Sequence, residues 1–179
     1  MFCIQVEYMI QIKKVLLVFL LCVSTSSFAF ASEMSVSHTD ADWNNGEGKV
    51  PKIGICKARK VGGKGMSPSI QVDGLPMGTV LLELYFTDED WNSEGAHGVV
   101  SYKVSSGEQS LVIPSFKGET NNLPQNFKAI SKHKARKLSD GIYLGPCSGG
   151  KGHTYVVYIY AKDKKGKKLA KAKLSLGKY

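Results

Sequence analysis

The chain has 179 residues, and its 24 lysines and arginines outnumber 15 aspartates and glutamates, giving a formal net charge of +9. This length suits one ordinary domain. The positive charge favours anionic partners such as phospholipid surfaces, polyanions or acidic proteins. The sequence contains no aromatic-basic motif of the kind that binds nucleic acid, so we expect no nucleic-acid partner.

Residues 1–31 have the pattern of a secretory signal peptide. Two lysines precede an apolar run over residues 15–23, and small residues follow up to Ala31. The run is shorter than the roughly 20 apolar residues that a membrane-spanning helix needs. We therefore expect cleavage before Ser32 and an exported protein, either periplasmic or secreted. Met9 is an alternative start, because it would leave the more usual short n-region.

Residues 32–50 are polar and are expected to form a flexible segment ahead of a single domain over residues 51–179. Within this segment, residues 40–46 superficially resemble a calcium-binding loop. The match fails because Asn45 stands where the sharp-turn glycine belongs and Pro51 where the bidentate glutamate belongs. We predict no metal site here.

The remaining chain is predicted to consist mainly of strands. Apolar or alternating runs between turn residues predict strands over residues 80–86, 99–104, 111–113, 155–161 and 170–176. The run at 155–161 is apolar on both faces, which suits a central buried strand. Only residues 125–137 could hold a short helix. The predicted fold class is mostly β, in one domain that is a β-sandwich.

Basic residues gather in two parts of the chain. One group comprises Lys128, Lys132, Lys134, Arg136 and Lys137, and the other lies within residues 162–173. Such groups attract an anionic membrane surface or an acidic protein target. The alternative is that they form a solvated basic face without a partner.

Two cysteines, Cys56 and Cys147, remain once the predicted signal peptide is removed. In an oxidising compartment a lone pair of cysteines usually forms a disulfide, so we expect these two to be bonded. The bond would tie the loop around Cys147 to a segment far earlier in the chain. Two free buried thiols are the alternative.

A glycine-rich loop that begins at Gly145 leads into the predicted strand at 155–161. It carries His153 and Tyr155, which are two residues apart and would leave the same face of a strand. Glycines also let a backbone approach a ligand closely. The pattern indicates a small polar site at the end of a sheet. Further polar candidates near strand ends are Asp88, Asp90 and His97.

Common catalytic patterns are missing from the sequence. The glycines at 62–65 lack the strand, helix and Lys-Ser/Thr ending of a phosphate loop. The chain also has no Gly-x-Ser-x-Gly elbow and no His-x-x-x-His pair for a zinc helix.

Five segments resemble motifs of the phosphatidylethanolamine-binding protein family, in the family's order. They are residues 67–79 (S-P-x-L-x-W-x-G-x-P-x-G-T), 87–90 (D-P-D), 97–100 (H-W-V-V), 145–155 (G-P-C-P-P…H-R-Y) and 169–179 (L-A-x-A-x-L-x-G-x-Y). Cys56 also stands where bacterial members often carry a cysteine. By this resemblance the chain is identified as a divergent, exported member of the bacterial branch.

The chain departs from these motifs at several positions. Glu89 replaces the proline of D-P-D, Gly98 replaces the aromatic residue after the histidine, and Thr154 replaces the arginine of H-R-Y. Ser148 and Gly149 stand in place of the two prolines after the cysteine. A looser pocket rim is the expected consequence.

The resemblance implies a β-sandwich of antiparallel sheets with few short helices and one small anion-binding pocket. The residues implied are Asp88, His97, His153 and Tyr155 as lining side chains, with Gly145 and Pro146 contributing backbone. Tyrosine and histidine donors suit a phosphate or carboxylate. Asp88 could orient a histidine or meet the ammonium of a zwitterionic headgroup. No cofactor and no metal are implied.

The resemblance therefore favours an exported, non-enzymatic protein that binds a phosphorylated or phospholipid-headgroup-like ligand. The main alternative is a protein-interaction or inhibitor module, like the kinase and protease inhibitors of the family, whose pocket is a vestige. A metal-assisted hydrolase built from Asp88, His97 and His153 is a weaker possibility, because no nucleophile or base stands nearby in sequence. A purely structural role for these polar residues is the last alternative.

Overall fold

The computed structural model describes residues 33–44 and 48–179. The predicted signal peptide at 1–31 lies outside the described residues, and so does its cleavage site. None of the helices in the described ranges is long and apolar enough to cross a membrane.

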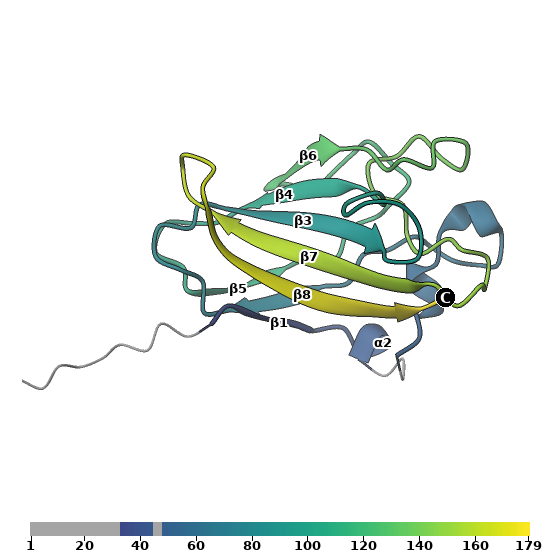
Figure 1. Cartoon of the computed structure of the whole chain (residues 1–179), viewed down its shortest axis with the longest axis horizontal. Helices are drawn as coiled ribbons and strands as arrows, with labels where there is room; N and C mark the ends of the chain where they lie inside the picture. Colours follow the sequence, from purple (N-terminus) through teal and green to yellow (C-terminus); the bar gives the residue numbers. More distant parts are fainter. Residues whose placement is uncertain (1–32, 45–47) are drawn as a thin grey trace, which may run out of the picture. The chain divides into compact units, whose positions relative to one another are not determined.

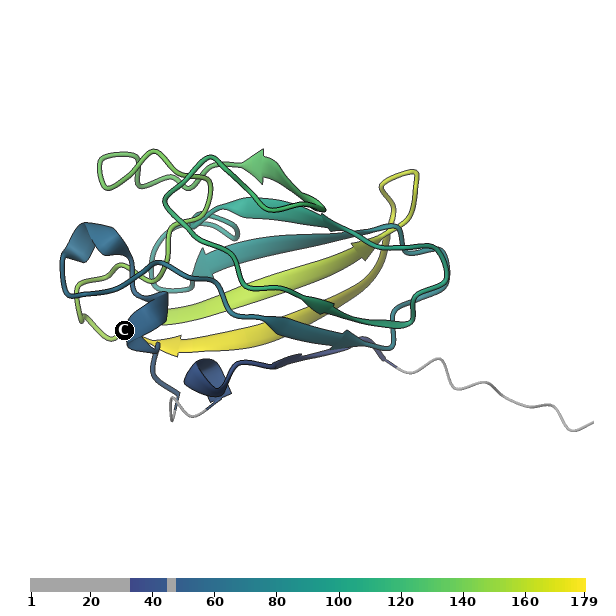
Figure 2. The same cartoon turned by 180° about the vertical axis from the view of Figure 1, so that it is seen from behind.

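The described strands form two sheets that stack face to face, as Figures 1 and 2 show from opposite sides. The three-stranded sheet has the order β1 (Ser35–His38), β2 (Ile70–Asp73), β5 (Ser110–Ile113). The five-stranded sheet has the order β6 (Phe127–Ser131), β4 (Val99–Lys103), β3 (Leu81–Asp88), β7 (Thr154–Lys162), β8 (Lys168–Lys178). All pairings within the two sheets are antiparallel. The predicted mostly-β sandwich is confirmed.

Within residues 33–44 and 48–179, helical structure is limited to short pieces. These are α2 (Ala41–Asn44) and the single 3₁₀ turns η1 (Lys52–Gly54) and η2 (Lys57–Arg59).

The core lies between the two sheets and follows the period of a strand. Alternate residues of β3 face inward, so Leu82, Leu84 and Phe86 are almost fully buried. They meet Val157 and Ile159 of the central strand β7 in one apolar cluster with residues of the other sheet. Burying each such side chain contributes about 1.5–3 kcal/mol. The strand predicted over residues 155–161 is therefore central and buried, as expected.

Part of the segment that was expected to be flexible, residues 32–50, belongs to the folded domain. Strand β1 pairs with β2 over its whole length. The Trp43 side chain is buried and its ring stacks on that of His38, with centroids 5.7 Å apart. The difference arises because pairing with β2, about thirty residues later, depends on long-range contacts that local composition does not reveal.

The short helix considered for residues 125–137 is wrong. The first half forms strand β6, which pairs with β4 at the edge of the five-stranded sheet. Phe127 packs its ring against Tyr102, with centroids 4.9 Å apart, and this contact holds the chain in the sheet. Most of β6 is exposed.

Candidate functional site

The site is built where β3 ends and β7 begins. The antiparallel register of these two central strands places Asp88 opposite Tyr155. Asp88 continues the inward-facing series of β3 and is therefore buried at the end of the core, with 2% of its surface exposed. Two residues 67 positions apart in sequence become neighbours through this register.

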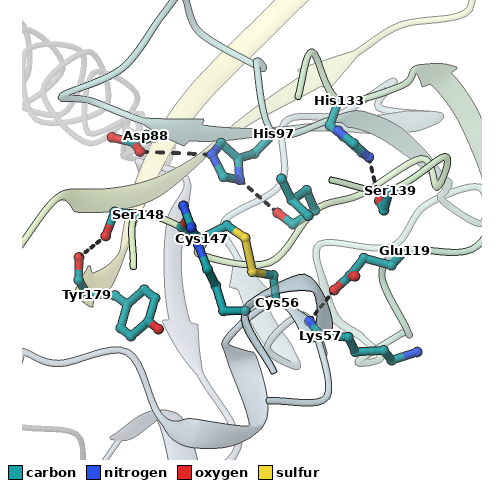
Figure 3. The surroundings of a disulfide bond; sticks show 12 residues. Cys56, Lys57, Asp88, His97, Glu119, His133, Ser139, Cys147, Ser148 and Tyr179 are labelled. Atoms are coloured by element: carbon teal, nitrogen blue, oxygen red, sulfur yellow. Dashed lines mark hydrogen bonds and ion pairs between the residues drawn. A yellow bond between two sulfur atoms is a disulfide. The ribbon is translucent and has the colours of Figure 1, made fainter. Parts of the chain in front are cut away.

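The Asp88 carboxylate is the centre of the polar cluster. Its Oδ2 lies 2.8 Å from Nδ1 of His153 and 4.0 Å from Nε2 of His97. Its Oδ1 accepts a hydrogen bond from the backbone N–H of Asp90 at 3.0 Å. Because a carboxylate only accepts, Nδ1 of His153 carries the proton of the short contact. Asp88 and His97 face one another in Figure 3.

The His97 imidazole is held in one tautomer by the backbone. Its Nδ1 lies 2.8 Å from the carbonyl oxygen of Leu144, which can only accept, so Nδ1 bears the proton. Burial lowers the pKa of His97, although the Leu144 carbonyl and the Asp88 charge oppose this shift. The ring edge-packs against Trp91 and Tyr155. His97 is therefore neutral near pH 7 and lines the site in a fixed orientation.

The Tyr155 phenol is also fixed. Its oxygen accepts a hydrogen bond from the backbone N–H of Cys147 at 3.1 Å. Burial raises the pKa of Tyr155 to about 12, and the hydrogen bond and charge of Asp88 act in the same direction. The phenol thus keeps its proton at neutral pH and is engaged by groups of the protein itself.

These residues surround a cavity of about 190 Å³. Its lining includes all four predicted side chains, Asp88, His97, His153 and Tyr155. The other polar or aromatic lining residues are Arg59, Trp91, Ser148 and Lys151, and the apolar ones are Ala135, Leu138, Leu144 and Cys147. The cluster that the resemblance implied is therefore assembled in one pocket.

Gly145 and Pro146 have a different place from the one expected. Neither is among the residues that line the cavity. A Cβ on Gly145 would lie 2.3 Å from the carbonyl oxygen of Gly54, so only glycine fits this backbone approach. The carbonyl of Pro146 accepts a hydrogen bond from the N–H of Cys56 at 3.0 Å. Both residues support the pocket wall from behind.

The predicted disulfide between Cys56 and Cys147 is confirmed, across a sequence separation of 91. It joins the residue just before η2 to the glycine-rich loop beside His97, as Figure 3 shows. On the loop side, the Ser148 hydroxyl donates to the backbone carbonyl of Tyr179. The loop is thus connected both to an early segment of the chain and to Tyr179, which follows β8.

The loop between β3 and β4, which carries Trp91 and His97, is anchored on the outer face of the sheet. The Glu89 carboxylate accepts hydrogen bonds from Tyr158 at 2.8 Å and from Lys173 at 2.7 Å. The bond from Lys173 lowers the pKa of Glu89. The Tyr160 hydroxyl donates to Glu94 in the same loop. The family motif has proline at the position of Glu89, and the proline ring would restrict the backbone there. In this chain the position is held instead by hydrogen bonds from Tyr158 and Lys173 to the Glu89 side chain.

Sequence reasoning missed the cationic residues of the cavity, Arg59 and Lys151, and the aromatic Trp91. Each lies in a loop or turn without a recognisable motif. The only signal for them is proximity: Arg59 follows Cys56 by three positions, Trp91 follows Asp90, and Lys151 precedes His153 by two.

One family of known proteins matches most of this chain. A family model described as "Phosphatidylethanolamine-binding protein" matches residues 40–178. The chain belongs to the phosphatidylethanolamine-binding protein family. The match spans every residue of the cavity, and the resemblance drawn from the five motifs is confirmed. No curated protein matches the chain.

Solved structures show the same fold in bacterial members of the phosphatidylethanolamine-binding protein family. One is E. coli YbcL, described as a new member of the mammalian PEBP family, with a TM-score of 0.59 and 17% identity over 83% of this chain and 98% of that chain. Another is CT736 of Chlamydia trachomatis, described as a PEBP homolog, with a TM-score of 0.52 and 20% identity over 82% of this chain and 97% of that chain. At these identities the likeness establishes the fold.

Proposed function

We propose that this chain is a non-enzymatic binding protein whose pocket takes a phosphate-bearing group, such as a phospholipid headgroup. The observation that carries the proposal is the Asp88–His153 contact at the cavity wall. With Nδ1 bound to Asp88, a protonated His153 has its Nε2–H as a second donor for an oxyanion. Arg59 and Lys151 add positive charge around the same cavity.

The size and chemistry of the cavity favour a small polar ligand. Drug-sized ligands occupy cavities of about 300–1,000 Å³, whereas this one measures about 190 Å³. A headgroup suits such a volume better than an acyl chain. If the ligand also carries an ammonium group, Asp88 and the Trp91 ring offer a carboxylate and an aromatic face to it. A zwitterionic headgroup would use both kinds of contact.

A binding role is favoured over catalysis by the state of the Ser148 hydroxyl. It donates to the Tyr179 carbonyl and interacts with the Tyr155 phenol. It is therefore not paired with a histidine that could act as its base. Among the described residues, no group of three or more His, Cys, Asp or Glu side chains is placed so that it could hold a metal ion.

We also propose that the protein is exported, to the periplasm or beyond. The disulfide between Cys56 and Cys147 supports an oxidising compartment. The signal-like pattern of residues 1–31 points to the same route.

A second candidate is a protein-interaction or inhibitor module. The observation that favours it is β6, an edge strand whose Ile130 is 49% exposed. An open edge can pair with a strand of a partner. A partner retained by wild type and by His153→Ala, but lost with Ile130→Lys, would favour this function over the pocket.

The test is calorimetric titration of the disulfide-bonded protein with O-phosphoethanolamine and inorganic phosphate. We expect His153→Ala and Asp88→Ala to weaken binding at least tenfold. His38→Ala and Asp140→Ala are matched controls, because neither residue lines the cavity, and they should bind as wild type does. Wild-type affinity in both pocket variants would overturn the proposal, as would a wild-type protein that binds neither ligand.

A further inference from the structure

We propose that the Arg59 guanidinium binds the phosphate group of the ligand in this pocket. The inference rests on the proposed function and deepens it. Arg59 lines the cavity together with His153 and Lys151. It lies outside every motif that carried the family resemblance, so the resemblance did not assign it a role.

The position of Arg59 is set at both ends of the side chain. Its backbone lies in η2, which begins immediately after Cys56, and Cys56 is bonded to Cys147. Its Nε donates to the carbonyl oxygen of Cys147 at 2.7 Å. The disulfide and this hydrogen bond therefore hold backbone and guanidinium against the same residue of the opposite loop. A binding group fixed in this way loses less conformational entropy when a ligand arrives.

Gly149 lies beside the guanidinium. A Cβ on Gly149 would lie 3.4 Å from Arg59 Cζ and 3.5 Å from its Nε and Nη1, which is ordinary van der Waals contact. Gly149 has a φ of +80°. Proline, which the family motif has here, is confined to a φ near −65°. The residue that replaces the proline of the family motif, Gly149, is therefore also the one that lies beside the Arg59 guanidinium.

The guanidinium keeps most of its binding capacity. Arginine has five N–H donors, and the Cys147 carbonyl uses the one on Nε. The four on Nη1 and Nη2 remain, in the fork geometry that matches two oxygens of one phosphate. Among the described residues, no carboxylate lies within ion-pair distance of Arg59. Its charge is thus available to an anion.

The chemistry recognised is a phosphate with at least two unesterified oxygens. Inorganic phosphate, a phosphomonoester and a phosphodiester headgroup all meet this condition. The three can be separated with inorganic phosphate, O-phosphoethanolamine and glycerophosphoethanolamine as probes.

The chain supplies a matched control for the test. Its two arginines, Arg59 and Arg136, stand in the identical tetrapeptide K-A-R-K, at residues 57–60 and 134–137. Arg136 is exposed and does not line the cavity. The same substitution can therefore be made in the same local sequence, once inside the pocket and once outside it.

Calorimetry with the three probes is the first measurement, on full-length, disulfide-bonded protein. We expect Arg59→Gln to weaken every probe that wild type binds by at least tenfold. Arg59→Lys should recover only part of the loss, because lysine keeps the charge but not the fork. Arg136→Gln should bind as wild type does. Equal affinity for all three probes would assign the site to phosphate itself, and tighter binding of the two ethanolamine esters would assign it to a headgroup.

Side-chain NMR of the wild-type protein gives a second measurement that does not depend on the stability of a variant. The Nε–H resonances of the two arginines should respond differently, with Arg59 shifting on titration and Arg136 unchanged. If His153→Ala loses binding while Arg59→Gln does not, or if the Arg59 resonance stays in place at saturation, the inference about Arg59 is wrong and the proposed function stands. If wild type binds none of the probes, the proposed function fails and this inference fails with it.

Discussion

Asp88, at the end of β3, accepts a hydrogen bond from Nδ1 of His153, with 2.8 Å between the two atoms. The carboxylate also interacts with the Tyr155 phenol and the Asp90 backbone, although it is almost fully buried. A buried charge is tolerated when several donors satisfy it. The polar cluster, the candidate binding site, is therefore also part of the architecture that joins β3 to β7.

The first prediction concerns Asp88→Asn, which keeps the size of the side chain and removes its charge. We expect the free energy of unfolding to fall by about 1–3 kcal/mol, because hydrogen bonds to a charged acceptor are lost and the new amide N–H₂ faces other donors. Denaturant unfolding measures the change. Asp140→Asn alters an exposed carboxylate paired with Lys132 and should leave the free energy of unfolding nearly unchanged. Equal stabilities for the two variants would contradict the role given to Asp88.

The dependence of stability on pH provides a second prediction. Burial lowers the pKa of both His97 and His133. The unfolded chain, with histidine pKa values near 6.5, then binds protons that the folded protein does not. The free energy of unfolding should be fully retained above about pH 6.5 and should decline as the pH falls, by at most about 1.4 kcal/mol per pH unit for each histidine.

Denaturant unfolding between pH 7.5 and 5 checks this slope. Asp88 and His153 bear on the pKa of His97. The charged groups that bear on the pKa of His133 are His97, Arg136, Asp140 and Lys132. His133→Asn and His97→Asn should each flatten the decline, whatever their effect on stability at pH 7.5. If both variants leave the slope unchanged, the decline in the free energy of unfolding does not arise from these two histidines.

The third prediction concerns the disulfide. Replacing Cys56 and Cys147 together by serine should lower the free energy of unfolding by about 2–5 kcal/mol, because the bond closes a loop with a sequence separation of 91. Adding reductant to wild type should produce a similar loss, and adding it to the double variant should produce none. A loss below about 1 kcal/mol would show that the bond adds little to the fold.

The fourth prediction concerns the anchor of the loop between β3 and β4. Glu89→Gln should cost less than about 1 kcal/mol of stability, because its ion pair with Lys173 is partly exposed. We expect a larger effect on the loop itself, seen as faster hydrogen exchange around residues 89–98. The charge-reversed pair Glu89→Lys with Lys173→Glu should restore slow exchange. Unchanged exchange in Glu89→Gln would mean that backbone contacts alone hold the loop.

The central strands and the site residues were accessible from sequence for different reasons. The apolar run at 80–86 and the alternation at 170–176 report directly on buried and half-buried strands. The glycine-rich loop and the ends of the predicted strands indicate His153, Tyr155, Asp88 and His97 as polar candidates, and motif resemblance groups them in one pocket. The pairing of Asp88 with Tyr155 in β3 and β7 shows why these segments converge. These features depend on short-range patterns or on motifs that are themselves local.

Other features depend on contacts that no local pattern encodes. Strand β1 exists because β2 pairs with it, and β6 because β4 does. Arg59 reaches the pocket through the disulfide and the Cys147 carbonyl. Gly145 was expected at the pocket surface, yet its lack of a Cβ serves a close approach to Gly54 behind the wall.

The most direct test of the account is a crystal structure of the disulfide-bonded protein grown with saturating O-phosphoethanolamine. We expect the phosphate in the cavity, with oxygens within hydrogen-bond distance of His153 Nε2 and of the Arg59 guanidinium. A cavity that holds only water at that concentration, or a ligand bound elsewhere on the surface, would contradict it.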